Sequence, residues 1–193
     1  MLVIGNGESR SGIDINSIND TKVGCNAIHR DFKIDHLVCV DKSMLSEVIR
    51  LKYHKHTQIY TRKTNYDIYI EDNIQVVPDL PYIGDLRPDS AIHWGSGPYA
   101  VLLATQLAQG ATVHMLGFDL YSASKQVNNV YKGTDNYTCA DKRAVDPRYW
   151  IYQIGRILDS YPTTQFVVHQ HRTWDLPDAW NKSNVSLDSI DYM

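Results

Sequence analysis

Two glycines, an asparagine and a serine stand within five positions near the start of the chain. The segment Gly5-Asn6-Gly7-Glu8-Ser9 directly follows residues 2–4, an apolar run with the length of a buried strand. Glycine lets the backbone turn sharply and bring peptide N–H groups close to an anion, while Asn6 and Ser9 add short polar contacts. This pattern predicts a site for a phosphate-bearing ligand, and a plain structural turn is the alternative.

The turn departs from two familiar phosphate-binding fingerprints. Arg10 stands where the dinucleotide pattern has its third glycine, and Asn26, not an acidic residue, follows the next extended segment. The chain also lacks the GxxxxGK[ST] sequence of a P-loop. NAD binding and P-loop phosphate transfer are therefore disfavoured.

A second glycine-containing segment, Gly95-Ser96-Gly97, precedes the most regular helical pattern in the chain. Residues 98–109 have apolar side chains at helical steps, with a proline in the first turn and Gly110 as the C-terminal stop. Free N–H groups and the helix dipole at such a start favour a phosphate or carboxylate. The alternative is that Ser96 only caps the helix, since serine is a preferred N-cap residue.

Histidine pairs and aspartates are the candidate metal ligands of the chain. Asp41 and Asp119 follow apolar runs of strand length, and the pairs His54-x-His56 and His169-x-His171 place alternate side chains on one face of an extended segment. Spacing fixes no third ligand. We therefore expect no metal site, with a loosely held divalent cation on nucleotide phosphates as the alternative.

The elements that must position these residues alternate between strand-like and helix-like patterns. Strands are expected at residues 2–4, 23–25, 37–40, 113–116 and 165–168, with two more within 57–77, and helices at 43–52, 98–109 and 149–160. This alternation predicts a Rossmann-like α/β fold, a doubly wound and mainly parallel sheet with right-handed crossovers. Ligands bind such sheets outside the carboxyl ends of the strands.

The length of 193 residues suits one domain, which we place at residues 1–180, followed by a loosely ordered tail at 181–193. The polar stretch 122–146 shows no periodicity and is long for a loop, which is typical of a functional or mobile segment. Whether this stretch becomes ordered when a ligand binds is left open.

Composition narrows the classes of partner. With 43% apolar and 21% charged residues the chain is ordinary globular protein, and its net charge of −3 gives no general attraction to nucleic acid. No stretch approaches the roughly 18 apolar residues of a membrane span, and three widely spaced cysteines support no disulfide framework. We expect a cytoplasmic protein that binds a small nucleotide, with a homo-oligomer left open.

Four short motifs occur in order: Val3-Ile4-Gly5-Asn6-Gly7-x-Ser9, Cys25-Asn26, Ser96-Gly97-x-Tyr99 and Gly117-x-Asp119-x-Tyr121. Together they resemble the bacterial sialyltransferases that act on lipooligosaccharide, within a wider group that includes 6-hydroxymethylpterin pyrophosphokinase-like proteins. The resemblance implies a Rossmann-like glycosyltransferase that takes a CMP-type nucleotide sugar and requires no cofactor or structural metal. Members this small also look like those carried by phages, which would place the protein in the host cytoplasm.

The resemblance also implies roles for individual residues. The nucleotide and its sugar would be held by the substrate-binding set Gly5, Asn6, Gly7, Ser9, Asn26, Ser96, Gly97 and Asp119. Tyr121 and Tyr131 would contact the departing phosphate and stabilise its negative charge.

The expected general base is missing from the sequence. The family uses a histidine before its late helix, but this chain has none between His114 and His169, and Asp141 falls at that position. An aspartate accepts a proton less readily than histidine at neutral pH, and His169 or His171 could substitute. The alternatives are therefore a non-catalytic nucleotide-binding module, which the missing histidine favours, and a pyrophosphokinase- or hydrolase-like enzyme that uses the same pocket.

Overall fold

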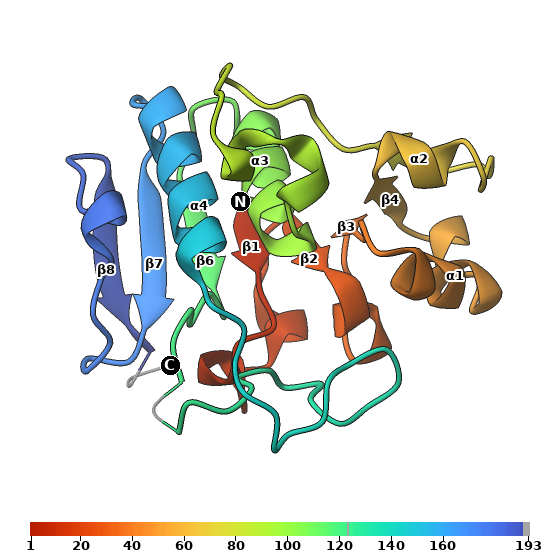
Figure 1. Ribbon diagram of the computed structural model, residues 1–193, viewed down its shortest axis with the longest axis horizontal. Helices are drawn as coiled ribbons and strands as arrows, with labels where there is room; N and C mark the ends of the chain where they lie inside the picture. The colour runs from red at the N-terminus through yellow and green to blue at the C-terminus, as the bar shows by residue number, and fades with distance from the viewer. Residues whose placement is uncertain (123, 191–193) are drawn as a thin grey trace.

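The computed structural model describes residues 1–122 and 124–190, and their strands form a single parallel sheet (Figure 1). The sheet has eight strands in the order β5-β4-β3-β2-β1-β6-β7-β8. In chain order they are β1 Leu2–Ile4, β2 Lys22–Cys25, β3 His36–Val38, β4 Gln58–Thr61, β5 Ile74–Val76, β6 Val113–Leu116, β7 Phe166–Gln170 and β8 Val185–Ser189. This confirms the predicted Rossmann-like α/β fold, and all seven strand pairings are parallel.

Helices cover both faces of the sheet, as a doubly wound fold requires. The α-helices are α1 Lys42–Arg50, α2 Lys63–Tyr66, α3 Ser96–Ala108 and α4 Arg148–Ser160. The three longer helices agree with the sequence prediction to within two residues at each end. Helix α1 packs on the face that carries Leu2 and Ile4, whereas α3 packs on the face that carries Val3.

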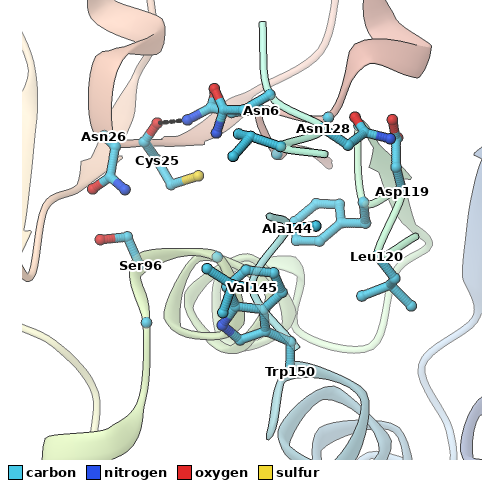
Figure 2. A pocket seen from close by; sticks show the side chains of 18 of the residues that line it. Asn6, Cys25, Asn26, Ser96, Asp119, Leu120, Asn128, Ala144, Val145 and Trp150 are labelled. Atoms are coloured by element: carbon cyan, nitrogen blue, oxygen red, sulfur yellow. Dashed lines mark hydrogen bonds between the residues drawn. The ribbon is translucent and has the colours of Figure 1, made fainter. Parts of the chain in front are cut away.

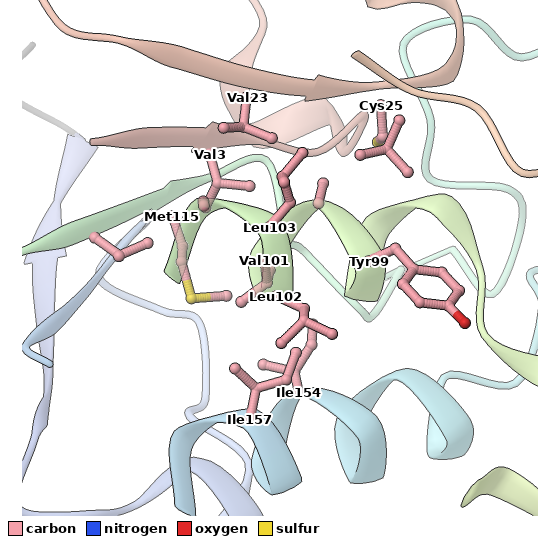
Figure 3. Packing of buried hydrophobic residues seen from close by; sticks show 14 of the residues in the cluster. Val3, Val23, Cys25, Tyr99, Val101, Leu102, Leu103, Met115, Ile154 and Ile157 are labelled. Carbon is pink, nitrogen blue, oxygen red and sulfur yellow. The ribbon is translucent and has the colours of Figure 1, made fainter. Parts of the chain in front are cut away.

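Helix α3 lies between the sheet and α4, which explains why it is apolar on nearly every side (Figure 3). Val3 is in register with Val23 on β2 and with Met115 on β6, and these three side chains form the floor on which α3 packs. Ile154 and Ile157 of α4 cover the opposite side of α3. This packing fixes the position of the start of α3 relative to the strand ends.

The strand order creates a switch point between β1 and β6. The chain runs outward from β1 to β5, and α3 then carries it back to β6 on the other side of β1. The two following turns approach closely, because a Cβ on Gly5 would lie 2.3 Å from the carbonyl oxygen of Gly117. Only glycine fits there, and a crevice at such a point is where doubly wound sheets bind ligands.

The sequence predicts a loosely ordered tail from residue 181. This prediction is wrong for residues 181–190, because this segment contains β8, which pairs with β7 at the edge of the sheet. Asn184 ties the strand down by donating from Nδ2 to the carbonyl oxygens of Leu158 at 3.1 Å and Thr164 at 3.3 Å. An edge strand needs little apolar pattern, and Leu187 is half exposed, so the sequence signal is weak. Residues 191–193 of the predicted tail lie outside the described residues.

No described helix has the length and hydropathy to cross a membrane.

Candidate functional site

A cavity of about 350 Å³ lies at the carboxyl ends of β1, β2, β3 and β6. It is lined by both glycine segments predicted from the sequence, Gly5–Gly7 after β1 and Gly95–Gly97 at the start of α3. Asn26, Asp41 and Asp119 also line it, each from the turn after a strand. Its volume falls within the roughly 300–1,000 Å³ typical of small-molecule sites.

The polar end of the cavity is formed by Asn6, Asn26 and Ser96 (Figure 2). Asn6 is fixed because its Nδ2 donates to the carbonyl oxygen of Cys25 at 3.1 Å. Ser96 is fixed as well, since its Oγ accepts the N–H of Val40 at 3.1 Å. Asn26 differs from both, because its Oδ1 is buried and has no hydrogen-bond partner among the described residues.

Eight buried side-chain N and O atoms of the described residues have no hydrogen-bond partner, and Asn26 is the one residue among them that lines the cavity. A buried polar group without a partner costs about 1–3 kcal/mol, so most such groups bind a ligand or water. The backbone conformation of Asn26 is left-handed, with φ of 54°, which asparagine tolerates better than most residues. This turn leads β2 into the short 3₁₀ helix Asn26–Arg30 and keeps the side chain at the cavity.

The remaining walls of the cavity are largely apolar. Figure 2 shows Val145 and Trp150 along the side opposite Asn6, and Leu120 at the end away from Asn26. Phe118 and Ile154 complete these walls. A flat aromatic and aliphatic surface of this kind can cover a base or the apolar face of a sugar.

Some backbone amides that line the cavity bond to other parts of the backbone, and others lie at the start of a helix. The N–H groups of Gly5 and Gly7 donate to the carbonyl oxygens of Leu116 at 2.8 Å and Gly117 at 2.9 Å, so they join two turns and do not point at a ligand. The amides of Ser96 and Gly97 lie in the first turn of α3, where a helix has no internal acceptors. Gly95, not Ser96, occupies the N-cap position, so the capping interpretation of Ser96 is wrong.

Ser9 and Asp119 bind each other. The Ser9 hydroxyl donates to Asp119 Oδ1 and the Ser9 N–H donates to Oδ2 at 2.9 Å, and Ser9 does not line the cavity. Gln170 Nε2 also donates to Asp119 Oδ1, at 2.9 Å. The carboxylate of Asp119 therefore joins the turns after β1 and β6 to the last residue of β7, and a Cβ on Gly7 would lie 2.3 Å from it.

The three residues expected to be catalytic lie outside the cavity. Tyr131 is buried, accepts a hydrogen bond from Arg10 at 3.1 Å and donates to Asp31 at 2.7 Å. Burial and the Asp31 carboxylate raise the pKa of Tyr131. Tyr121 lines a neighbouring depression, and Asp141 is exposed on the 122–146 loop. The structure does not bring these side chains together with Asn26 and Ser96.

Histidine does not line the cavity anywhere in the described chain. His169 is buried beside His114, with their ring nitrogens 3.0 Å apart, and neither it nor His171 reaches the site. Cys25 does line the cavity, but burial raises the pKa of its thiol to about 12, which keeps it protonated. Among residues 1–122 and 124–190, no three histidine, cysteine or acidic side chains gather to hold a metal ion.

Several residues of the long loop border the cavity, and the sequence did not single them out. The Tyr137 hydroxyl accepts hydrogen bonds from Asn6 Nδ2 at 3.1 Å and from the N–H of Ala27 at 3.4 Å. Arg143 lines the cavity and forms no salt bridge with any described residue. The sequence signal for Tyr137 and Arg143 is only the length and polarity of the loop. In its described part the loop contains a single isolated β-bridge, between Gln126 and Arg143.

Comparisons with family models, curated proteins and solved structures give no match to this chain. The resemblance to sialyltransferases therefore stays a prediction from four short motifs.

Proposed function

We propose that the chain binds a nucleotide of the CMP type in this cavity and uses a nucleotide sugar as a glycosyl donor. The observation that carries the proposal is the unpartnered Oδ1 of Asn26, a residue that lines the cavity at the β1–β6 switch point. A buried acceptor that no protein group satisfies is a suitable partner for a ribose hydroxyl or a base amino group.

The phosphate would lie at the start of α3. The amides of Ser96 and Gly97 and the positive end of the α3 dipole favour an anion there. Arg143, at the rim and without a salt bridge to the described residues, supplies a charged donor. The wall that contains Phe118 and Trp150 would then cover the base or the sugar.

Transfer needs a group that accepts a proton. The acceptor hydroxyl would attack the anomeric carbon and form a new C–O bond, while the bond to the phosphate breaks and the electron pair leaves with CMP. We assign the acceptor's proton to Asp41, a residue that lines the cavity and whose carboxylate makes no hydrogen bond or salt bridge to the described residues. The Tyr137 hydroxyl, positioned by Asn6 and Ala27, would donate to the departing phosphate.

A second candidate is a nucleotide-binding module without catalysis. The observation in its favour is that Tyr121, Tyr131 and Asp141 lie outside the cavity and that no histidine among the described residues lines it. This candidate predicts that CMP binds but that no CMP-sugar is consumed.

Calorimetric titration with CMP tests the binding step. Asn26→Gly removes the amide but keeps the left-handed backbone accessible, and we expect a weakening of about two- to tenfold, the value of one hydrogen bond. Asn73→Gly is the matched control, because Asn73 also has a left-handed backbone, with φ of 64°, but is exposed beside β5. Equal CMP affinity in both variants would remove Asn26 from the site.

Hydrolysis of a CMP-sugar in the absence of acceptor tests the catalytic step. We expect Asp41→Asn to lower turnover by roughly 10²-fold or more, the usual effect of losing a general base, and to leave CMP affinity nearly unchanged. Asp141→Asn, on the exposed loop, should have little effect. Turnover that depends on Asp141 and not on Asp41 would contradict the assignment, and CMP binding without turnover would select the non-catalytic module.

A further inference from the structure

A second depression, of about 470 Å³, adjoins the proposed nucleotide cavity. Leu120, Arg143, Ala144 and Val145 line both of them, so the two spaces share one wall. A group bound in the depression would therefore lie next to whatever occupies the cavity.

The depression contains two cationic side chains and one carboxylate, that of Asp146, whose pKa is lowered by hydrogen bonds from Arg148 and by the nearby charge of Arg143. Lys125 and Arg143 line it, and neither forms a salt bridge within the described part of the chain. Their segments are held together, because the N–H of Ala144 donates to the carbonyl oxygen of Lys125 at 3.0 Å. Asp146 also lines the depression, but its carboxylate accepts hydrogen bonds from Arg148 Nε at 2.7 Å and from the Arg148 N–H at 3.0 Å.

An aromatic ring lies beside these charges. Tyr121 lines the depression with 43% of its surface exposed, and Trp174 supports it at a ring distance of 6.3 Å. An exposed tyrosine offers an apolar face and a hydroxyl to one ligand, which suits the ring of a sugar. Two cations beside such a ring suit a sugar that also carries an anionic group.

We propose that this depression binds the second substrate of the protein, a small carbohydrate that carries a phosphate or carboxylate. Lys125 and Arg143 hold its anionic group and Tyr121 packs against its ring. The role as acceptor site rests on the proposed function: Leu120 and Val145 line both spaces, and the attacking hydroxyl would have to extend past this wall into the cavity toward Asp41, which follows β3.

Calorimetric titrations of the full chain with glucose 6-phosphate, glucuronic acid and glucose test the proposal. We expect both anions to bind more tightly than glucose, and Lys125→Gln to weaken their binding about two- to fivefold, as expected for one solvent-accessible ion pair. The control is Lys33→Gln, an exposed lysine that precedes β3 at the opposite end of the strands. Anions that bind no better than glucose, or binding that Lys125→Gln leaves unchanged, would overturn the proposal.

Lys125 separates this proposal from the nucleotide proposal, because it lines only the depression. Lys125→Gln should leave CMP affinity unchanged, and Asn26→Gly should leave anion affinity unchanged. Loss of CMP binding by Lys125→Gln would show that the two sites are one and would overturn the separate subsite. Lys125-dependent anion binding in a chain that does not bind CMP would support the anion site and refute the nucleotide proposal.

Discussion

A methyl group added at Gly5 and one added at Gly97 would meet very different surroundings. At Gly5 the new Cβ would lie 2.3 Å from the backbone oxygen of Gly117, and backbone cannot move aside as a flexible side chain can. At Gly97 the nearest atom would be a ring carbon of Phe118 at 3.7 Å, an ordinary van der Waals contact. Both residues line the same cavity, so the pair separates folding from binding.

We therefore expect Gly5→Ala to lower the free energy of unfolding by about 1–3 kcal/mol. Thermal unfolding should show a drop of roughly 2–4 °C per kcal/mol for a chain of this size. Gly97→Ala should leave the melting temperature unchanged or slightly raised, because alanine is the better helix former, but should weaken CMP binding by placing a methyl group in the cavity. Equal melting temperatures for the two variants would contradict the close approach of the turns after β1 and β6.

At the scale of elements, the structure attaches the 122–146 loop to α1 and the 3₁₀ helix Asn26–Arg30. Arg30 donates to both carboxylate oxygens of Glu47 at 2.7 Å, and Arg30 Nη1 donates to Thr134 Oγ1 at 2.8 Å. Asn136 Nδ2 donates to the same carboxylate at 2.7 Å. The hydrogen bond from Arg30 lowers the pKa of Glu47. Thr134 and Asn136, which these hydrogen bonds hold, come just before Tyr137 in the sequence. The contacts therefore hold this part of the loop against the cavity.

Arg30→Gln should loosen this attachment. We expect faster amide hydrogen exchange in residues 134–138 and a several-fold weaker CMP affinity, because Tyr137 would lose its fixed position beside Asn6. Lys63→Gln is the matched control, since it breaks an exposed ion pair with Asp67 on α2. Unchanged exchange in residues 134–138 would show that the loop is held by other contacts.

Particular elements show how far sequence reasoning reached. The strands other than β8, the three longer helices and the meeting of Asn6, Asn26 and Ser96 were predictable, because apolar periodicity marks elements and parallel strand ends share one edge of the sheet. Arg143 was not predictable, because its place depends on hydrogen bonds between distant segments of an irregular loop. Tyr131 was assigned from spacing alone, and the contacts that bury it, with Arg10 and Asp31, are non-local.

For the whole molecule, buried histidines predict how stability depends on pH. Burial lowers the pKa values of His29, His36 and His169, and the proximity of His114 adds to the effect at His169 although Asp188 opposes it. The unfolded chain, in which histidine keeps its ordinary value of 6.5, then binds more protons than the folded chain below that pH. The contribution of these histidines to the free energy of unfolding is fully present above about pH 6.5. It is lost as the pH falls through their lowered pKa values in the folded chain.

We expect the melting temperature to fall between pH 7 and pH 5. Glu47 and Asp89, whose pKa values are lowered in the fold, contribute losses only at more acidic pH, below the ordinary values of 4.5 and 3.8. His169→Gln should flatten the decline, whereas His56→Gln, at an exposed position, should not. A melting temperature that is constant from pH 7 to pH 5 would contradict the neutral state of the buried histidines.

We propose that a nucleotide binds where the first glycine turn, Asn26 and the start of α3 meet. The most direct test is a titration of ¹⁵N-labelled protein with CMP, followed by backbone amide resonances. We predict progressive, saturable shifts of the Asn26, Ser96 and Gly97 amides, with Asn73 beside β5 unmoved. If saturating CMP leaves the Asn26, Ser96 and Gly97 resonances in place, the nucleotide does not bind in this cavity.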